Sequence, residues 1–243
     1  MGSPRLREVL HQIRAARQRG DTPLVLFDLD GTLLRNGARH LAILRTFCAL
    51  NADKQGPAWR TLQEQAASLS PDAFGYHVTG PLAPVTRPTH QKLLRFWSDR
   101  YFTNHACADD EPAPGAVDYV VAAHRAGAFV WYLTGRPAER MRRGTEASLR
   151  AHGFPLDTER VALTLRGREH ARDADFKEVI SDRRPHDGPV LAQFENEPGH
   201  ANAFLRRFPD ALHFLVGDVH SDDAPTPHPD LVRTDDFVLP EPA

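Results

Sequence analysis

The hydrophobic pattern of this chain alternates between short apolar runs and longer segments with helical spacing. Runs too short for a helix are typical of buried parallel strands, and we predict strands at residues 24–27, 129–133, 161–165, 190–194 and 212–216. Apolar residues at helical spacing predict helices at residues 4–19, 110–127, 137–152, 176–180 and 201–208. Because strands and helices alternate, the expected fold class is α/β, with a Rossmann-like, doubly wound parallel sheet.

One long segment interrupts this alternation. Between residues 37 and 108, apolar and aromatic side chains recur at helical spacing, and we predict that they form a core: Leu41, Leu44, Cys48, Trp59, Leu62, Ala66, Leu94, Trp97 and Tyr101. Residues 70–88 are broken by proline and glycine and are predicted to be a loop. We therefore predict an inserted helical cap at 37–108 and an α/β core domain formed by 1–36 and 109–243. The proline-rich tail from residue 222 is expected to wrap the surface.

Composition narrows the function classes. The chain has 243 residues, 41% hydrophobic and 26% charged, and a net charge of -2, which gives no overall field for nucleic acid or an anionic membrane. No apolar run approaches the roughly 18 residues of a membrane span, and the N-terminal segment lacks the apolar stretch of a signal peptide. The two cysteines show no metal-ligand spacing, so a reducing cytoplasm is expected. The basic first helix leaves nucleic acid open as a partner without indicating it, and nothing indicates an oligomeric state.

The first predicted strand ends in Asp28-Leu29-Asp30-Gly31-Thr32. Acids before a glycine often only initiate a turn. Two carboxylates this close also raise each other's pKa unless a cation lies between them, and a hard divalent metal with oxygen ligands meets that need. Gly31 lets the backbone turn sharply after the second acid.

Two later residues suit an anionic substrate. Thr134 directly follows the second strand, where a hydroxyl can bond a phosphoryl oxygen beside the free N–H groups of the next helix; capping that helix is the alternative role. Lys177 stands out because 27 of the 30 basic residues are arginine, so a lysine indicates that a compact ammonium is required. A solvated helix position is the alternative for Lys177, and Arg166 is its rival as the cation.

The fourth strand ends at Glu195, whose carboxylate can complete a metal shell with Asp28 and the backbone carbonyl of Asp30. Asp218, within Gly217-Asp218-Val219-His220-Ser221-Asp222, competes for that role. Strand counting favours Glu195, because the fourth strand is expected to neighbour the first. The roles of Asn196 and Glu197 stay open.

Taken in this order, these segments resemble the four motifs of the haloacid dehalogenase (HAD)-like hydrolase superfamily, in its phosphatase branch with a helical cap after the first motif. The fourth motif departs from the pattern, because Asn196 stands where a second acid is usual. The resemblance implies an Mg²⁺-dependent phosphohydrolase that acts on a small-molecule phosphate monoester. Asp28 would be the nucleophile that forms an aspartyl-phosphate, Asp30 the general acid and base, and Thr134 and Lys177 would hold the phosphoryl oxygens.

Three other functions compete with a phosphatase. A phosphotransferase such as a mutase shares these acids, and a non-catalytic binding protein on the same fold fits the unusual fourth motif. An Asp-x-Asp can also belong to a metal-dependent glycosyltransferase, although there it does not normally follow a first strand. A zinc site near His105 and Cys107 lacks paired ligand spacing. The substrate cannot be read from the sequence, although several residues of the cap and its flanking loop are candidates to face it: Asn36, Arg39, His40, Tyr76, His77 and Trp97.

Overall fold

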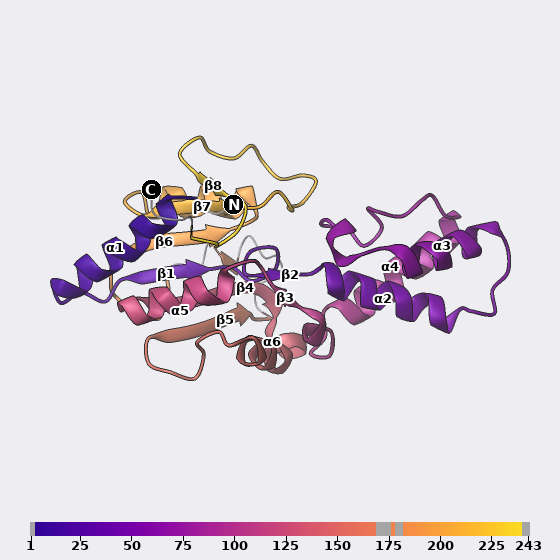
Figure 1. Cartoon of the computed structure of the whole chain (residues 1–243), viewed down its shortest axis with the longest axis horizontal. Helices are drawn as coiled ribbons and strands as arrows, with labels where there is room; N and C mark the ends of the chain where they lie inside the picture. The colour runs from indigo at the N-terminus through magenta and orange to yellow at the C-terminus, as the bar shows by residue number, and fades with distance from the viewer. Residues whose placement is uncertain (1–2, 169–175, 178–181, 240–243) are drawn as a thin grey trace. The chain divides into compact units, whose positions relative to one another are not determined.

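The computed structural model describes residues 3–168, 176–177 and 182–239 (Figure 1). The chain divides into two compact units. The first comprises Met1–Leu34, Pro112–Glu139 and Leu149–Ala243, and the second comprises Arg35–Glu111 and Arg140–Ser148. The second unit contains the predicted insertion together with part of helix α6 (Ala138–His152). The sequence predicted this helix but did not indicate that part of it belongs to the second unit.

The first unit is built on a six-stranded sheet whose neighbouring strands are all parallel. Its order is β5-β4-β1-β6-β7-β8. The strands are β1 (Leu24–Phe27), β4 (Phe129–Pro137), β5 (Val161–Arg166), β6 (Val190–Glu195), β7 (Leu212–Val216) and β8 (Val232–Thr234). The predicted parallel α/β fold is therefore confirmed, with β1 at its centre between β4 and β6.

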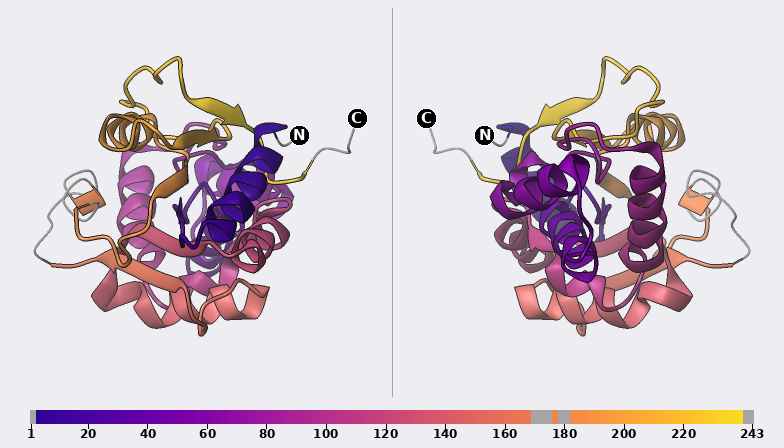
Figure 2. Two further views of the ribbon diagram at one scale, coloured as in Figure 1. Left: turned by 90° about the vertical axis from the view of Figure 1, so that its left-hand side faces the viewer. Right: turned by 90° about the vertical axis from the view of Figure 1, so that its right-hand side faces the viewer.

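Helices cover both faces of this sheet (Figures 1 and 2). The alternation of side chains along β1 shows how the faces are filled: Val25 and Phe27 belong to the larger apolar cluster with α1 (Arg5–Gln18) and α5 (Ala116–Ala126). Leu24 and Leu26 belong to a second cluster with α8 (Pro198–Arg207). Residues 176 and 177 of the predicted helix 176–180 are helical, and its remaining residues lie outside the described part of the chain.

The second unit is helical. Its elements are α2 (Gly37–Leu50), α3 (Pro57–Ser68), η1 (Pro71–Ala73), α4 (Arg87–Tyr101) and η2 (Ala106–Asp109). Two short strands, β2 (Leu34–Arg35) and β3 (Glu111–Pro112), pair where the chain passes between the units. Most of the predicted core is buried or packed against the unit's apolar cluster. The prediction for Leu94 was wrong: this side chain is exposed, because its neighbour Leu93 is the residue that α4 turns inward.

A buried ion pair lies inside this second unit. Arg39 donates two hydrogen bonds to Asp110, of 2.8 and 2.6 Å, and neither side chain is accessible to solvent. The guanidinium also lies 4.6 Å from the centre of the Tyr101 ring. His40 is likewise buried, stacked on aromatic rings and accepting a hydrogen bond from the Trp97 indole at 3.0 Å. Arg39 and His40 are thus core residues of their own unit, whereas Tyr76 is exposed.

The C-terminal tail does more than wrap the surface. Val232–Thr234 pairs with β7 as the last strand of the sheet, and Phe237 is buried in the larger apolar cluster. So short a strand has no alternation of its own that a sequence pattern could reveal. Within the described residues, no helix is both long and apolar enough to cross a membrane.

Candidate active site

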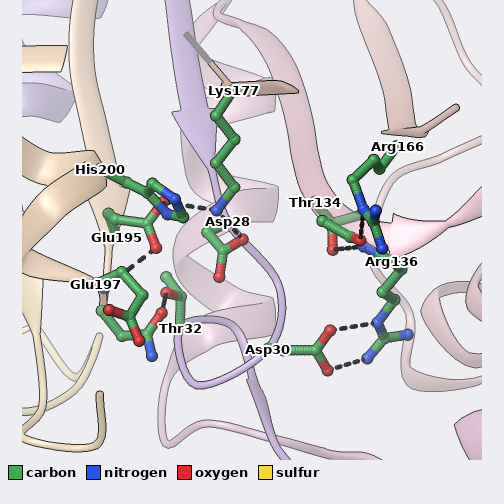
Figure 3. Close-up of polar contacts among 12 residues, drawn as sticks. Asp28, Asp30, Thr32, Thr134, Arg136, Arg166, Lys177, Glu195, Glu197 and His200 are labelled. Atoms are coloured by element: carbon green, nitrogen blue, oxygen red, sulfur yellow. Dashed lines mark hydrogen bonds and ion pairs between the residues drawn. The ribbon is translucent and has the colours of Figure 1, made fainter. Parts of the chain in front are cut away.

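The carboxyl ends of the three central strands bring the predicted residues to one edge of the sheet (Figure 3). Asp28 follows β1 directly, Thr134 lies near the end of β4, and Glu195 is the last residue of β6. Phe27 pairs with Tyr132 on one side and with Phe194 on the other, so Asp28, Thr134 and Glu195 each lie one or two residues beyond the same level of the sheet. This register is what places acids separated by more than half of the chain in one site.

Asp28, Lys177 and Glu195 form a buried cluster. The Lys177 ammonium donates to Asp28 Oδ1 at 2.7 Å and to Glu195 Oε2 at 2.8 Å. Only 3% of the Lys177 side chain is exposed, and the exposed fractions of the Asp28 and Glu195 side chains are 7% and 1%. The structure thus places the lysine between the two carboxylates of neighbouring strands.

The pKa values of the two carboxylates in this cluster are shifted in opposite directions. Burial, and then the negative charge of Glu195, raise the pKa of Asp28 to about 7. For Glu195, burial acts to raise the pKa, but the attraction of Lys177 and the contact with His200 outweigh it and lower the pKa to about 2. Two buried carboxylates face one lysine ammonium, so a further cation would favour the ionised form of both.

The donor atoms present suit a hard divalent cation. Asp28 and Glu195 offer carboxylate oxygens, the ligands that such ions prefer, and the backbone carbonyl of Asp30 lies in the same loop. No group of three or more histidine, cysteine or acidic side chains is arranged to hold a metal within the described ranges. A cation here would thus have two protein carboxylates and would complete its shell from backbone, water or a bound anion.

Asp30 is held by an arginine that the sequence did not single out. Arg136 donates from Nε to Asp30 Oδ2 at 2.7 Å and from Nη2 to Oδ1 at 2.6 Å (Figure 3). The arginine side chain is 1% exposed and that of the aspartate 30%. Arg136 was visible only as part of the turn after Thr134, and one arginine among 27 is a weak signal.

The end of β4 is fixed by two further hydrogen bonds. The Thr134 hydroxyl accepts a hydrogen bond from the backbone N–H of Arg136 at 3.3 Å, and Arg166 donates from Nε to the carbonyl of Gly135 at 3.0 Å. Arg166, the rival of Lys177, therefore supports the backbone that presents Thr134. Helix α6 begins at Ala138, shortly after this buried hydroxyl.

Asp218, the competitor for Glu195, lies in the loop after β7. The Asp218 side chain is 90% exposed and contacts Arg233 at 3.6 Å. Its Gly-Asp-x-x-x-Asp run follows β7, which is separated from β1 by β6. Glu195, by contrast, is the last residue of β6, the strand that pairs with β1.

Asn196 and Glu197 join loops. The Thr32 hydroxyl donates to Asn196 Oδ1 at 3.3 Å, and Asn196 Nδ2 donates to the Val219 carbonyl at 2.7 Å. Glu197 accepts bonds from the backbone N–H and the hydroxyl of Ser221, at 2.7 and 2.9 Å. Gly31 has φ +81°, and a Cβ there would lie 2.4 Å from Asn196 Nδ2, so both geometry and space require glycine. These residues tie the acidic turn to the loop after β7.

His200, in the first turns of α8, lies next to the cluster with Nδ1 3.6 Å from Glu195 Oε2. Sequence reasoning did not identify it. A histidine five residues after a predicted metal ligand gives no distinctive spacing among 13 histidines. Its position beside Glu195 makes it part of the charge environment of the site.

Comparison with models of protein families finds no match, and comparison with curated proteins finds none either. Solved structures do match over most of the chain. A protein from Clostridium difficile, provisionally described as a phosphatase, superposes with a TM-score of 0.50 at 11% identity, over 84% of this chain and 89% of its own. A protein from Haemophilus somnus, described as a predicted phosphoglycolate phosphatase, has a TM-score of 0.49 at 15% identity, over 89% of this chain and 95% of its own. A HAD family hydrolase from Deinococcus radiodurans has a TM-score of 0.44 at 19% identity over 86% and 85%.

Proposed function

We propose that this chain, which has the fold of the HAD-like hydrolases, is a phosphatase that uses Mg²⁺ and hydrolyses a small-molecule phosphate monoester through an aspartyl-phosphate on Asp28. The observation that supports this most strongly is the buried cluster of Asp28, Lys177 and Glu195 at the carboxyl ends of β1 and β6. Two acids and one ammonium at that edge of a parallel sheet suit the binding and transfer of a phosphoryl group.

The reaction needs a nucleophile and a proton shuttle. A carboxylate oxygen of Asp28 attacks phosphorus, the bond from phosphorus to the leaving oxygen breaks, and Asp30 gives that oxygen a proton. Water then attacks the aspartyl-phosphate, Asp30 takes the proton of that water, and Asp28 is regenerated with release of inorganic phosphate. Asp30 suits this task because its side chain is partly exposed, unlike the buried Asp28.

Lys177 and Thr134 supply positive and polar partners for the phosphoryl group. The ammonium already lies against Asp28, so it meets the oxygens of a phosphorus bound to that residue. The buried hydroxyl of Thr134 lies at the end of the adjacent strand and can donate to the same group. Both contacts offset charge that is spread over the oxygens in the transition state.

Mg²⁺ would be held by the carboxylates of Asp28 and Glu195 and by the backbone carbonyl of Asp30. When bound, it offsets charge on the phosphoryl oxygens and helps to orient them. Mg²⁺ usually keeps several waters and takes one or two carboxylates together with substrate phosphate, so a third acidic side chain is not required. The presence of Asn196, where a second acid is usual, is compatible with this arrangement.

Phosphate release from a panel of phosphorylated metabolites tests the proposal. We expect release with Mg²⁺ and none with EDTA, loss of activity in Asp28→Asn, and wild-type rates in Asp218→Asn, whose side chain is exposed. Transfer of the phosphoryl group to a second metabolite without phosphate release would identify a phosphotransferase instead. A folded protein that neither binds Mg²⁺ nor turns over any substrate would identify a non-catalytic member of the fold.

A further inference from the structure

The end of β4 departs from a regular strand where it presents Arg136. The register with β5 shifts between Thr134 and Pro137, so that Gly135 and Arg136 bulge from the ladder. Such irregularities re-aim a side chain at the edge of a sheet. Arg166 and the Thr134 hydroxyl both bond the backbone of this bulge, which fixes it in place.

The re-aimed side chain meets Asp30 with two parallel hydrogen bonds of 2.6 and 2.7 Å. A guanidinium is a planar fork, and this bidentate geometry fixes both the position and the plane of the carboxylate. Lysine could satisfy the charge but not the plane. The carboxyl group of Asp30 is therefore held more strictly than a turn requires.

Exposure differs sharply between the two partners. Arg136 is 1% exposed and approaches from inside the unit, whereas 30% of the Asp30 side chain remains accessible. The contact thus fixes the group from the protein side and leaves it accessible.

We propose that Arg136 is a positioning residue, which holds the Asp30 carboxyl group where it exchanges a proton with the leaving oxygen. This inference rests on the proposed phosphatase function. Arg136 itself need not touch substrate, because it acts through Asp30. Removal of the Arg136 guanidinium should therefore lower kcat/KM most for substrates whose leaving oxygen must receive a proton.

Two substrates with different leaving groups test the inference. With the full chain and Mg²⁺, we compare kcat/KM for p-nitrophenyl phosphate, whose phenolate leaves readily, with that for a simple alkyl phosphate, whose alkoxide needs a proton. A misplaced catalytic group can cost about 100-fold, so we expect Arg136→Met to lose about 100-fold on the alkyl phosphate and less than about 10-fold on the aryl phosphate. Arg136→Lys should fall in between.

Arg150→Met is the matched control. Arg150 forms the same kind of fork with Asp157, but both side chains are exposed on the surface. We expect this variant to keep wild-type rates on both substrates. A loss as large as that of Arg136→Met would overturn the inference, since the effect would then not depend on Asp30.

A double variant separates positioning from folding. Asp30→Asn leaves a buried guanidinium without its carboxylate, so thermal unfolding must first show which variants fold. If Arg136 acts through Asp30, Arg136→Met should add little to the catalytic loss when Asp30 is already asparagine. Equal losses on both substrates, or additive losses in the double variant, would overturn the inference while leaving the phosphatase function intact. A wild-type protein that releases phosphate neither from these two substrates nor from the metabolite panel would overturn both.

Discussion

At Asp28 the structure buries a carboxylate whose pKa is raised to about 7 by burial and by Glu195. Its ionised form is therefore disfavoured in the folded protein without metal. Replacing Asp28 with asparagine should reduce turnover by at least about 1,000-fold, because no carboxylate remains to attack phosphorus. In EDTA at pH 8 the same variant should unfold at a higher temperature than wild type, by roughly 2–4 °C for each kcal/mol regained. Phosphate release and thermal unfolding measure the two effects, and an active Asp28→Asn protein would contradict the assignment.

The same residue determines a dependence on pH. Between 3.8, the ordinary pKa of the unfolded chain, and about 7, folded Asp28 keeps a proton that the unfolded chain releases. The free energy of unfolding in EDTA should therefore fall as pH rises from about 4 to 7, by at most about 1.4 kcal/mol per pH unit from this group. Mg²⁺ should accordingly stabilise the protein more at pH 8 than at pH 5. Denaturant unfolding across this range, with and without Mg²⁺, measures both effects.

Asp28→Asn is the necessary reference for that curve. Burial lowers the pKa of His213, so this residue adds stability as pH rises toward 6.5 and opposes the effect of Asp28. Glu195, with its pKa lowered to about 2, loses its contribution only as pH falls from about 4.5. The difference in the free energy of unfolding between wild type and Asp28→Asn, taken at each pH, isolates the contribution of Asp28. A difference that does not change with pH would contradict the shifted pKa.

At the scale of elements, Asn196 joins the turn after β1 to the loop after β7. Asn196→Asp removes the donor to the Val219 carbonyl and places a charge on a side chain that is 6% exposed. We expect a loss of about 1–3 kcal/mol in the free energy of unfolding. Asn202→Asp is the matched control, because Asn202 also bonds loop backbone, at Thr226 and His228, but on the exposed surface. An Asn196→Asp protein that is as stable as wild type and binds Mg²⁺ more tightly would show a metal-ligand position instead.

The strands that a sequence can predict are those whose own residues decide their burial. Leu24 to Phe27 is buried on both faces, so its apolar run is visible without knowledge of the fold. Val232–Thr234 is a strand only because β7 lies beside it, and its sequence therefore gave no signal. Leu93 and Leu94 show the same limit in a helix, since a one-residue error in phase moves a side chain from the core to the surface.

The site follows the same division. Asp28, Thr134 and Glu195 could be predicted because each stands at a strand end, and strand order follows from simple topology. Lys177 could be predicted because lysine is rare in this chain. Arg136 and His200 depend on a bulge and on the first turns of α8, where tertiary packing decides which side chain faces the acids. No spacing in the sequence reveals either.

At the scale of the whole molecule, each unit has its own apolar core. We expect calorimetry to resolve two unfolding transitions. Arg39→Met leaves Asp110 buried without its charged partner. It should therefore lower the free energy of unfolding of the second unit by about 3–5 kcal/mol, which moves that unit's transition to a lower temperature. Mg²⁺ should raise only the transition of the first unit, which contains the acids. A single transition that responds equally to both changes would contradict this expectation.

The central place of β1 in the sheet has a consequence for synthesis. This strand leaves the ribosome before both of its neighbours, which begin only at Phe129 and Val190. At roughly 5–20 residues per second, its final neighbour emerges on the order of ten seconds later. During that interval an apolar segment with at least one open edge is accessible to chaperones and to other nascent chains. A nascent chain that stalls before Val190 should accordingly be recognised by a holdase and should release no phosphate.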